Sequence, residues 1–193
     1  MYVNNTYRQQ EVYLSMANRV TVLPFWDINL SVDYQWNKLN ANLTDFPYPR
    51  RNTTLVAAAT SLHFDRFKFQ ASVLGTFVHE NVASDTTSAG NKMEFTPTAI
   101  ASYKPFKNID FNLRAFYKRI FRMPTLNDLY YTFIGNIKLK PEYTNQYNIG
   151  FTYQKLFTGT WLQALNVQLD AYYNEVENKI IATPTNNFFR WTM

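Results

Sequence analysis

Residues 25–37 read "FWDINLSVDYQWN", and apolar and polar side chains alternate in this stretch without an error from Trp26 to Asn37. Successive side chains of a β-strand point to opposite faces, so strict alternation predicts a strand with one apolar and one polar side. The polar side carries aspartate, asparagine, serine and glutamine. The apolar side carries Trp26, Ile28, Leu30, Val32, Tyr34 and Trp36.

The length of this strand indicates what its apolar side faces. Strands of soluble proteins usually have about five or six residues, whereas the step from Trp26 to Trp36 spans about 33 Å at roughly 3.3 Å per residue. A tilt of about 45° projects this length to about 23 Å, close to the ~25 Å apolar band of a membrane β-barrel. We interpret the apolar side as lipid-facing, with the two tryptophans at the two membrane interfaces.

Seven further segments show the same alternation. They lie near 7–22, 53–64, 66–80, 93–103, 109–118, 146–154 and 165–174. Together with the opening stretch they predict about eight strands, and no helical period longer than a turn or two accompanies them. Pro97 has no N–H to donate to a strand ladder, so we expect a local bulge there.

Short and long connections alternate between the predicted strands. The short ones are Leu23-Pro24, Asp65, 105–108 and 158–163. The long ones are 39–52, 81–91, 120–141 and the segment after 177. In an antiparallel meander this places every long loop at one end of the sheet, which is a feature of membrane barrels. The predicted fold class is therefore all-β, an antiparallel up-and-down sheet of a transmembrane barrel.

Composition excludes several functional classes. The chain has 193 residues, enough for one domain or a piece of one. Its net charge of +5 comes from scattered Lys and Arg, so we expect no nucleic-acid partner. It has no cysteine, which excludes disulfides and thiol catalysis, and no apolar run long enough for a transmembrane helix. His63 and His79 are isolated in the sequence, so we expect no enzyme, metal site or cofactor.

Four short motifs follow one another within residues 116–153. They are Phe121-Arg122-Met123-Pro124-Thr125, Asn127-Asp128-Leu129-Tyr130, Gly135-Asn136-Ile137-Lys138-Leu139-Lys140-Pro141-Glu142 and Tyr147-Asn148-Ile149-Gly150. In this order they resemble the TonB-dependent receptors of bacterial outer membranes, where an Ala, a Pro and a Glu are usual at the places of Met123, Ile137 and Asn148. The resemblance extends weakly along the rest of the alternating pattern.

This resemblance implies a plugged barrel of about 22 strands, with short periplasmic turns and long extracellular loops. Residues 1–193 would supply about eight of these strands as a partial barrel domain, and a plug domain with a TonB box would lie outside this chain. The implied location is the outer membrane of a Gram-negative bacterium. The implied partners are membrane lipid, TonB acting through the plug, and a scarce ligand of the ferric siderophore or cobalamin class.

The same resemblance supplies the candidate site residues. Those of the motif-bearing loop are Phe121, Arg122, Pro124, Asn127, Asp128, Tyr130, Gly135, Asn136, Leu139, Pro141 and Glu142. Four residues of this loop either contact substrate or plug, or fold the loop inward and seal it: Asn127, Asp128, Tyr130 and Tyr131. On the polar strand faces, Arg114, Lys118 and Arg119 either contact the plug or an anionic substrate, or are solvated and cross-paired inside the barrel.

Three alternatives remain open at the level of sequence. A passive porin-like or adhesin-like barrel would share the strand pattern but would have no plug or TonB box. An outer-membrane enzyme would need a Ser/His or acid/His pair on adjacent strands, and none is apparent. A soluble antiparallel β-barrel that binds a ligand would bury the apolar side in its own core.

Overall fold

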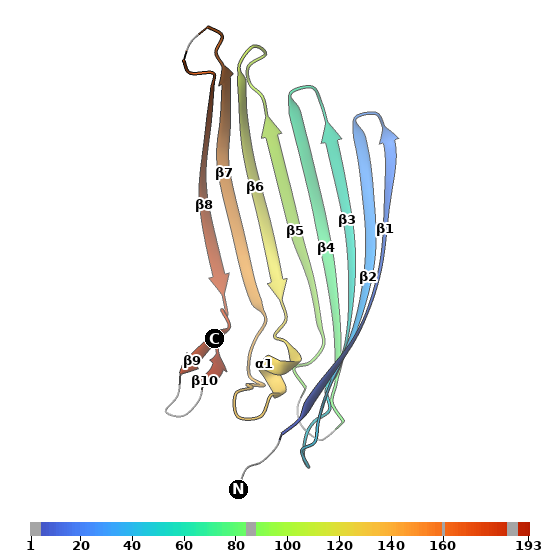
Figure 1. The fold of residues 1–193 in the computed structure, drawn as a ribbon. Coiled ribbons are helices and arrows are strands. Elements are labelled where there is room, and N and C mark those ends of the chain that lie inside the picture. Colours follow the sequence, from blue (N-terminus) through green and yellow to red (C-terminus); the bar gives the residue numbers. More distant parts are fainter. Residues whose placement is uncertain (1–4, 84–87, 160, 185–188) are drawn as a thin grey trace.

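The computed structural model describes residues 5–83, 88–159, 161–184 and 189–193 and shows one long antiparallel sheet (Figure 1). Eight strands lie in sequence order, and each pairs with the next. Their bounds are β1 (Tyr7–Leu23), β2 (Trp26–Ala41), β3 (Arg50–His63), β4 (Phe67–Asn81), β5 (Lys92–Tyr103), β6 (Asp110–Arg122), β7 (Glu142–Leu156) and β8 (Ala164–Glu177). The predicted all-β, up-and-down fold is confirmed, with strand ends shifted by a few residues.

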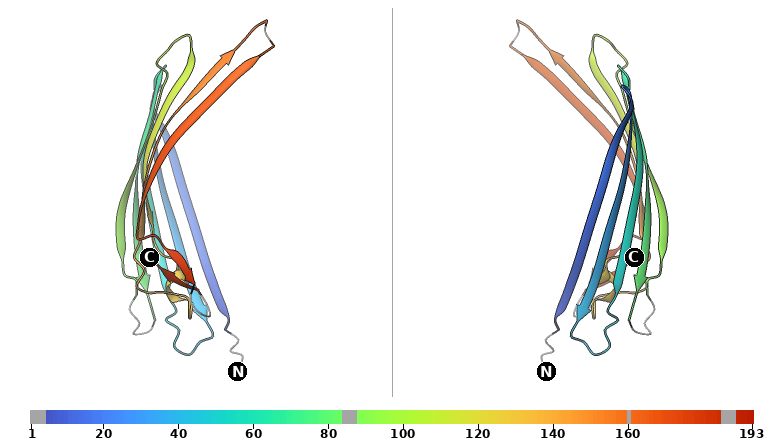
Figure 2. Two further views of the ribbon diagram at one scale, coloured as in Figure 1. Left: turned by 90° about the vertical axis from the view of Figure 1, so that its left-hand side faces the viewer. Right: turned by 90° about the vertical axis from the view of Figure 1, so that its right-hand side faces the viewer.

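Three shorter elements lie beside the sheet. They are the helix α1 (Leu126–Tyr130) and the strands β9 (Ile181–Pro184) and β10 (Phe189–Thr192), which pair as a hairpin. Figure 2 shows that the sheet is curved and that α1 and this hairpin lie on its concave side, at the end with the long loops. Neither the helix nor the hairpin was predicted. Among the described residues, no helix has the length and apolar character needed to cross a bilayer.

The strand register keeps the apolar sides of neighbouring strands together. Trp26 lies opposite Leu62, and Leu62 lies opposite Phe69. Leu39, on the polar side of β2, is only 1% exposed and packs in the cluster that includes α1, so the polar side is the concave one. Leu30, on the apolar side, is 53% exposed. The convex face is therefore a broad apolar surface with no covering element in the described part of the chain.

Short and long connections lie at opposite ends of the sheet (Figure 1). Only 24–25 separate β1 from β2, and only 64–66 separate β3 from β4. The connection 123–141, which contains α1, lies at the other end. The predicted alternation is confirmed, although 84–87, 160 and 185–188 of the predicted connections lie outside the described residues.

The bulge expected at Pro97 is not present, and that prediction was wrong. β5 pairs with β4 without interruption through the pair of Pro97 and Val73. On its other side β5 pairs with β6 only from Thr98 onward, so Pro97 lies where these two strands part and no N–H is needed from it. The register is irregular instead between Thr21 and Leu23 of β1, next to a short turn.

The convex face provides the first testable prediction. In the intact protein, Leu30→Arg is expected to destabilise the folded state by about 2–4 kcal/mol, because it puts a charge near the middle of the lipid-facing side. The control Ser31→Arg puts the same side chain on the concave face and is expected to stay within about 0.5 kcal/mol. Urea unfolding in lipid vesicles measures both changes. Equal effects of the two variants would contradict the assignment of the faces.

Candidate functional site

Helix α1 begins at a capping box, in which two residues satisfy each other's backbone N–H groups. The Asp128 N–H donates to Thr125 Oγ1 over 3.1 Å, and the Thr125 N–H donates to Asp128 Oδ2 over 2.9 Å. Asp128 is buried by this arrangement. Sequence reasoning missed the helix start, although the Thr-x-x-Asp spacing signals it.

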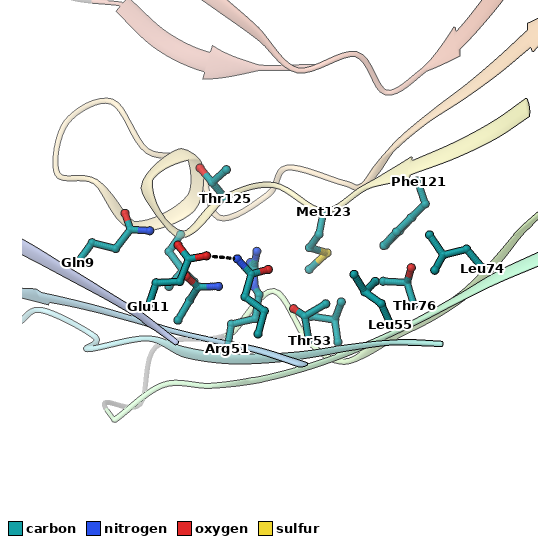
Figure 3. A pocket seen from close by; sticks show the side chains of 14 residues that line it. Gln9, Glu11, Arg51, Thr53, Leu55, Leu74, Thr76, Phe121, Met123 and Thr125 are labelled. Carbon is teal, nitrogen blue, oxygen red and sulfur yellow. Dashed lines mark hydrogen bonds between the residues drawn. The ribbon is translucent and has the colours of Figure 1, made fainter. Parts of the chain in front are cut away.

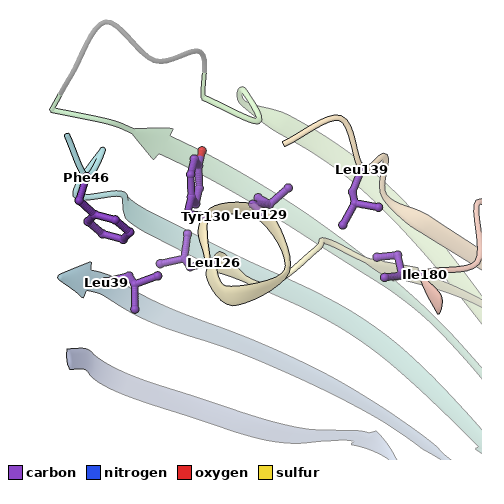
Figure 4. Close-up of a cluster of buried hydrophobic side chains, with 7 residues drawn as sticks. All are labelled: Leu39, Phe46, Leu126, Leu129, Tyr130, Leu139 and Ile180. Carbon is purple, nitrogen blue, oxygen red and sulfur yellow. The ribbon is translucent and has the colours of Figure 1, made fainter. Parts of the chain in front are cut away.

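An apolar cluster holds α1 against the concave face of the sheet (Figure 4). Its buried members are Leu39, Phe46, Leu126, Leu129, Tyr130, Leu139 and Ile180. They come from β2, the loop after it, α1, the loop after α1 and the segment after β8. Full burial of a leucine side chain stabilises by about 1.5–3 kcal/mol, so this cluster accounts for the inward position of the motif-bearing loop.

A buried polar network, formed by Arg51, Glu80 and Tyr130, joins the same loop to the sheet. Arg51 on β3 and Glu80 on β4 are directly opposite each other. Arg51 Nε donates to Glu80 Oε2 over 2.7 Å, and Arg51 Nη1 donates to the carbonyl oxygen of Pro124 over 2.5 Å. The Tyr130 hydroxyl donates to Glu80 Oε1. The network thus connects two strands to both ends of the segment that carries α1.

Burial of this ion pair is tolerated because its charged groups have partners. The Glu80 side chain is fully buried and that of Arg51 is 8% exposed. The Ala89 N–H is a further donor. Its nitrogen lies 3.2 Å from Glu80 Oε1 and 3.2 Å from the Tyr130 hydroxyl oxygen, and both oxygens accept from it. Burial, reinforced by the hydrogen bond to Glu80, raises the pKa of Tyr130 above its usual value. The hydroxyl therefore keeps its proton and remains a donor at neutral pH.

A recess of about 510 Å³ lies between this loop and the concave face (Figure 3). Its sheet side is mainly polar and its loop side is mainly apolar. The lining includes Gln9, Glu11, Gln35, Thr76, Phe121 and Met123. Gln35 Nε2 donates to Glu11 Oε1 over 2.6 Å, so part of the polar lining is already hydrogen-bonded. Groups of this kind can bind a polar peptide segment or a small polar ligand.

The remaining motif residues make contacts within the chain. At Gly135 a Cβ would lie 2.6 Å from the Tyr131 carbonyl oxygen, so only glycine fits this turn. Asn136 Nδ2 donates to the Trp191 carbonyl oxygen over 3.0 Å, which fixes the hairpin to the loop. The Ile180 N–H donates to Glu142 Oε2 over 3.0 Å. These side chains order the loop.

Other motif positions are more open or lie at the edges of the loop. Asn127 is exposed, and its Nδ2 lies 3.4 Å from Gln9 Oε1. Arg122 is exposed at the end of β6. The Pro141 carbonyl oxygen accepts a hydrogen bond from Asn178 Nδ2 over 3.3 Å.

The three cations predicted for the barrel interior do not form one site. Arg114 makes an ion pair with Asp170, at 2.7 Å between Nη2 and Oδ2. The pair bridges over Gly150 of the intervening strand β7, where a Cβ would lie 2.2 Å from Asp170 Oδ1. Arg119 lies over the ring of Tyr143 at 5.2 Å. Lys118 is exposed.

His63 is not isolated in the structure, contrary to the expectation from sequence. Its Nε2 lies 3.0 Å from Asp27 Oδ2, and the same oxygen accepts from Arg19 over 2.6 Å. Asp27 also accepts from the Thr21 hydroxyl. These residues come from three neighbouring strands at the end with the short turns. In the described part of the chain, no group of three or more His, Cys, Asp or Glu is placed to hold a metal ion.

This geometry is that of a β-barrel protein, of which the chain forms an open segment of the wall. The antiparallel sheet curves around a polar interior, and its long loops fold inward at one end. A family model described as "TonB dependent receptor-like, beta-barrel" matches residues 2–192. The chain belongs to this family, and the resemblance found in its motifs is confirmed.

This chain matches only part of the length of each relative. The chain is 26% identical over 182 residues to the vitamin B12 transporter BtuB of Vibrio vulnificus (strain YJ016). The matched region is 93% of this chain and 27% of that protein. Among solved structures, the copper transporter OprC matches with a TM-score of 0.72 and 16% identity, over 97% of this chain and 32% of that one.

A second solved structure gives a similar match. It is a double mutant of the Serratia marcescens hemophore receptor HasR in complex with its hemophore HasA and heme, with a TM-score of 0.69 and 12% identity, over 97% of this chain and 37% of that one. At such identities the structural matches establish the fold alone. The chain spans well under half the length of these relatives.

The buried network provides the second prediction. Tyr130→Phe removes the hydroxyl that bonds Glu80 and is expected to weaken docking of α1 by about 1–3 kcal/mol, because a buried carboxylate oxygen loses a donor. Faster amide hydrogen exchange in 126–139 of the intact protein measures the change. Tyr172→Phe, at a 77% exposed position, is the matched control and is expected to leave exchange unaltered. Unchanged exchange in Tyr130→Phe would contradict the role of the network.

The ion pair across β7 provides the third prediction. Gly150→Ala is expected to destabilise the intact protein by about 1–3 kcal/mol, because the new methyl group would overlap Asp170 and the Leu169 carbonyl oxygen, which lies 2.7 Å from the Cβ position. Gly75→Ala is the control, since its Cβ would meet only the movable rings of Phe77 and Phe95 at 3.1 Å or more. Urea unfolding compares the two, and an equal or larger loss at Gly75 would contradict the argument.

Proposed function

We propose that this chain is part of the barrel wall of a receptor in the outer membrane of a Gram-negative bacterium, which binds a scarce ligand and imports it with energy supplied through TonB. The observation that carries the proposal is the family match across residues 2–192, together with the apolar convex face of the eight-stranded sheet. In this mechanism the barrel is a scaffold, and the loops and the plug hold the ligand-specific chemistry.

Within this proposal, residues 1–193 belong to a barrel domain whose plug lies elsewhere in the protein. The chain matches 27% of the length of the vitamin B12 transporter and 32% of the copper transporter chain, which supports this arrangement because each relative has further sequence outside the matched region. Among the described residues, β1 and β8 each pair with one neighbour only. A membrane barrel leaves no strand edge unpaired in lipid, so further strands are expected beside both. The polar concave face, with Arg114 and Lys118, would then face the plug.

The proposed ligand belongs to the cobalamin or ferric siderophore class. The sequence relative is named as a vitamin B12 transporter, which supports cobalamin. The structural neighbours are named for copper and for a hemophore with heme. The ligands in these names differ, but each is or contains a metal, which supports a metal-containing ligand.

Uptake by the bacterium that makes this protein tests the proposal as a fourth prediction. Deletion of the gene is expected to abolish growth on limiting cobalamin or on limiting iron supplied as a siderophore, because import of one of them depends on this receptor. Deletion of the gene for TonB is expected to have the same effect on that ligand, whereas a passive porin-like barrel would continue to transport without TonB. Growth on both ligands unaffected by either deletion would contradict the proposal.

A further inference from the structure

A second pocket, of about 460 Å³, lies beside α1 in the layer of long loops. Three segments line it: α1 through Leu129 and Tyr130, the following loop through Ile137 and Lys138, and β10 through Arg190 and others. It is separate from the recess beneath residues 123–126, which lies toward β1–β4. Its volume is within the range of small-molecule sites.

Strand β10 is positioned so that its cation lines this pocket. Alternate residues of a strand point to opposite sides, and Arg190 and Thr192 line the pocket while Trp191 packs against the buried apolar cluster. The Trp191 N–H donates to the Ile134 carbonyl oxygen over 3.1 Å. The Trp191 carbonyl oxygen accepts from Asn136 Nδ2 over 3.0 Å. The backbone of β10 is therefore fixed against the loop that carries Lys138.

The lining of the pocket carries two cations and no acidic side chain. Lys138 and Arg190 come from segments far apart in the sequence, and neither has an ion-pair partner in the parts of the chain that the structure describes. This differs from the sheet, where Arg51 and Arg114 both pair with carboxylates. An anion in the pocket would be attracted by both charges. Arginine and lysine together bind carboxylates and phosphates well.

The rest of the lining combines apolar and aromatic side chains with Gly135, Asn136 and Thr192. Leu129 and Ile137 line the pocket, and so does Tyr130, whose hydroxyl is engaged with Glu80. Such walls favour an organic body attached to the anionic group over a bare inorganic ion. The hairpin and α1 lie on the concave side of the sheet, away from the apolar convex face (Figure 2). Because the pocket lies away from the apolar convex face, we take its ligand to be a diffusible molecule rather than a membrane lipid.

We propose that this pocket binds a small organic molecule through its carboxylate or phosphate group, with Lys138 and Arg190 as the residues that hold the anion. The inference rests on the proposed function only in taking this molecule to be the imported ligand or a part of it. It assigns to the pocket an anionic class of ligand, which the names of the relatives do not specify.

Binding of citrate and of inorganic phosphate to the purified full-length protein in a zwitterionic detergent tests the site, as a fifth prediction. At an ionic strength of about 0.02 M, where screening is weak, calorimetry is expected to show binding of citrate that is tighter than binding of phosphate. Lys138→Gln and Arg190→Gln are each expected to raise the Kd by about tenfold, through loss of a charge-assisted hydrogen bond. The double variant is expected to show no binding.

Lys107→Gln is the matched control, because Lys107 is an exposed lysine at the opposite end of the sheet. It is expected to bind citrate as the wild type does. No binding of either anion to the wild type, wild-type binding by the double variant, or equal weakening by Lys107→Gln would each overturn the proposal. Protection of the Lys138 amine from acetylation by citrate, followed by mass spectrometry, tests the wild type without any substitution.

Two further experiments complete the test. The first distinguishes a diffusible anion from a lipid headgroup, and the second distinguishes failure of this inference from failure of the proposed function. Vesicles of phosphatidylglycerol are expected not to displace citrate, and displacement would overturn the assignment to a diffusible ligand. In cells, the double variant is expected to lose uptake of the ligand that the wild type imports. TonB-dependent uptake at the wild-type rate in the double variant would overturn this inference and leave the proposed function intact.

Discussion

Strand register is the constraint on which the rest of this structure depends. Side chains alternate with a period of two, so a slip by one residue would exchange the apolar and polar faces of a strand. Each of the seven neighbouring pairs from β1 to β8 keeps its apolar side with that of the next strand. The convex apolar face and the concave polar face both follow from this alignment.

The polar contacts of the concave face also follow from register. Arg51 and Glu80 are cross-strand partners, and the short fixed distance between such positions allows a direct ion pair. Arg114 and Asp170 are two strands apart, and they meet only because the residue between them is Gly150. A buried charge without a partner costs several kcal/mol, so these pairings permit charged residues on a wall that also packs against inward-folded loops.

Local patterns predicted the parts of the fold that depend on neighbouring residues. Alternation located all eight long strands, and the motif phrases in 116–153 identified the family. The Arg51–Glu80–Tyr130 network was not predictable in this way, because its members come from β3, β4 and α1, and nothing in the sequence aligns them. Pro97 was misjudged for a similar reason, because the sequence does not show that β5 pairs with β6 only from Thr98 onward. Thr125 and Asp128 carried a readable signal for α1, whereas no local signal accompanied the hairpin at β9 and β10.

The paired arginines of the wall and the two cations of the loop pocket differ in their surroundings, and the difference has a physical cause. At three places in the wall a cation has a carboxylate within reach at a position fixed by the strand ladder: Arg19 and Arg51 pair with a carboxylate of the next strand, and Arg114 pairs with one two strands away. In the loop layer, Lys138 and Arg190 are exposed to water and retain most of their hydration, so an unpaired charge costs little there. A site that must exchange its anion needs cations that are hydrated and free of internal partners, because an internal carboxylate would compete with the ligand. The ion pairs of Arg19, Arg51 and Arg114 in the wall, and two pocket cations with no ion-pair partner among the described residues, therefore fit a scaffold that is stable where these strands meet and able to bind an anion at the pocket.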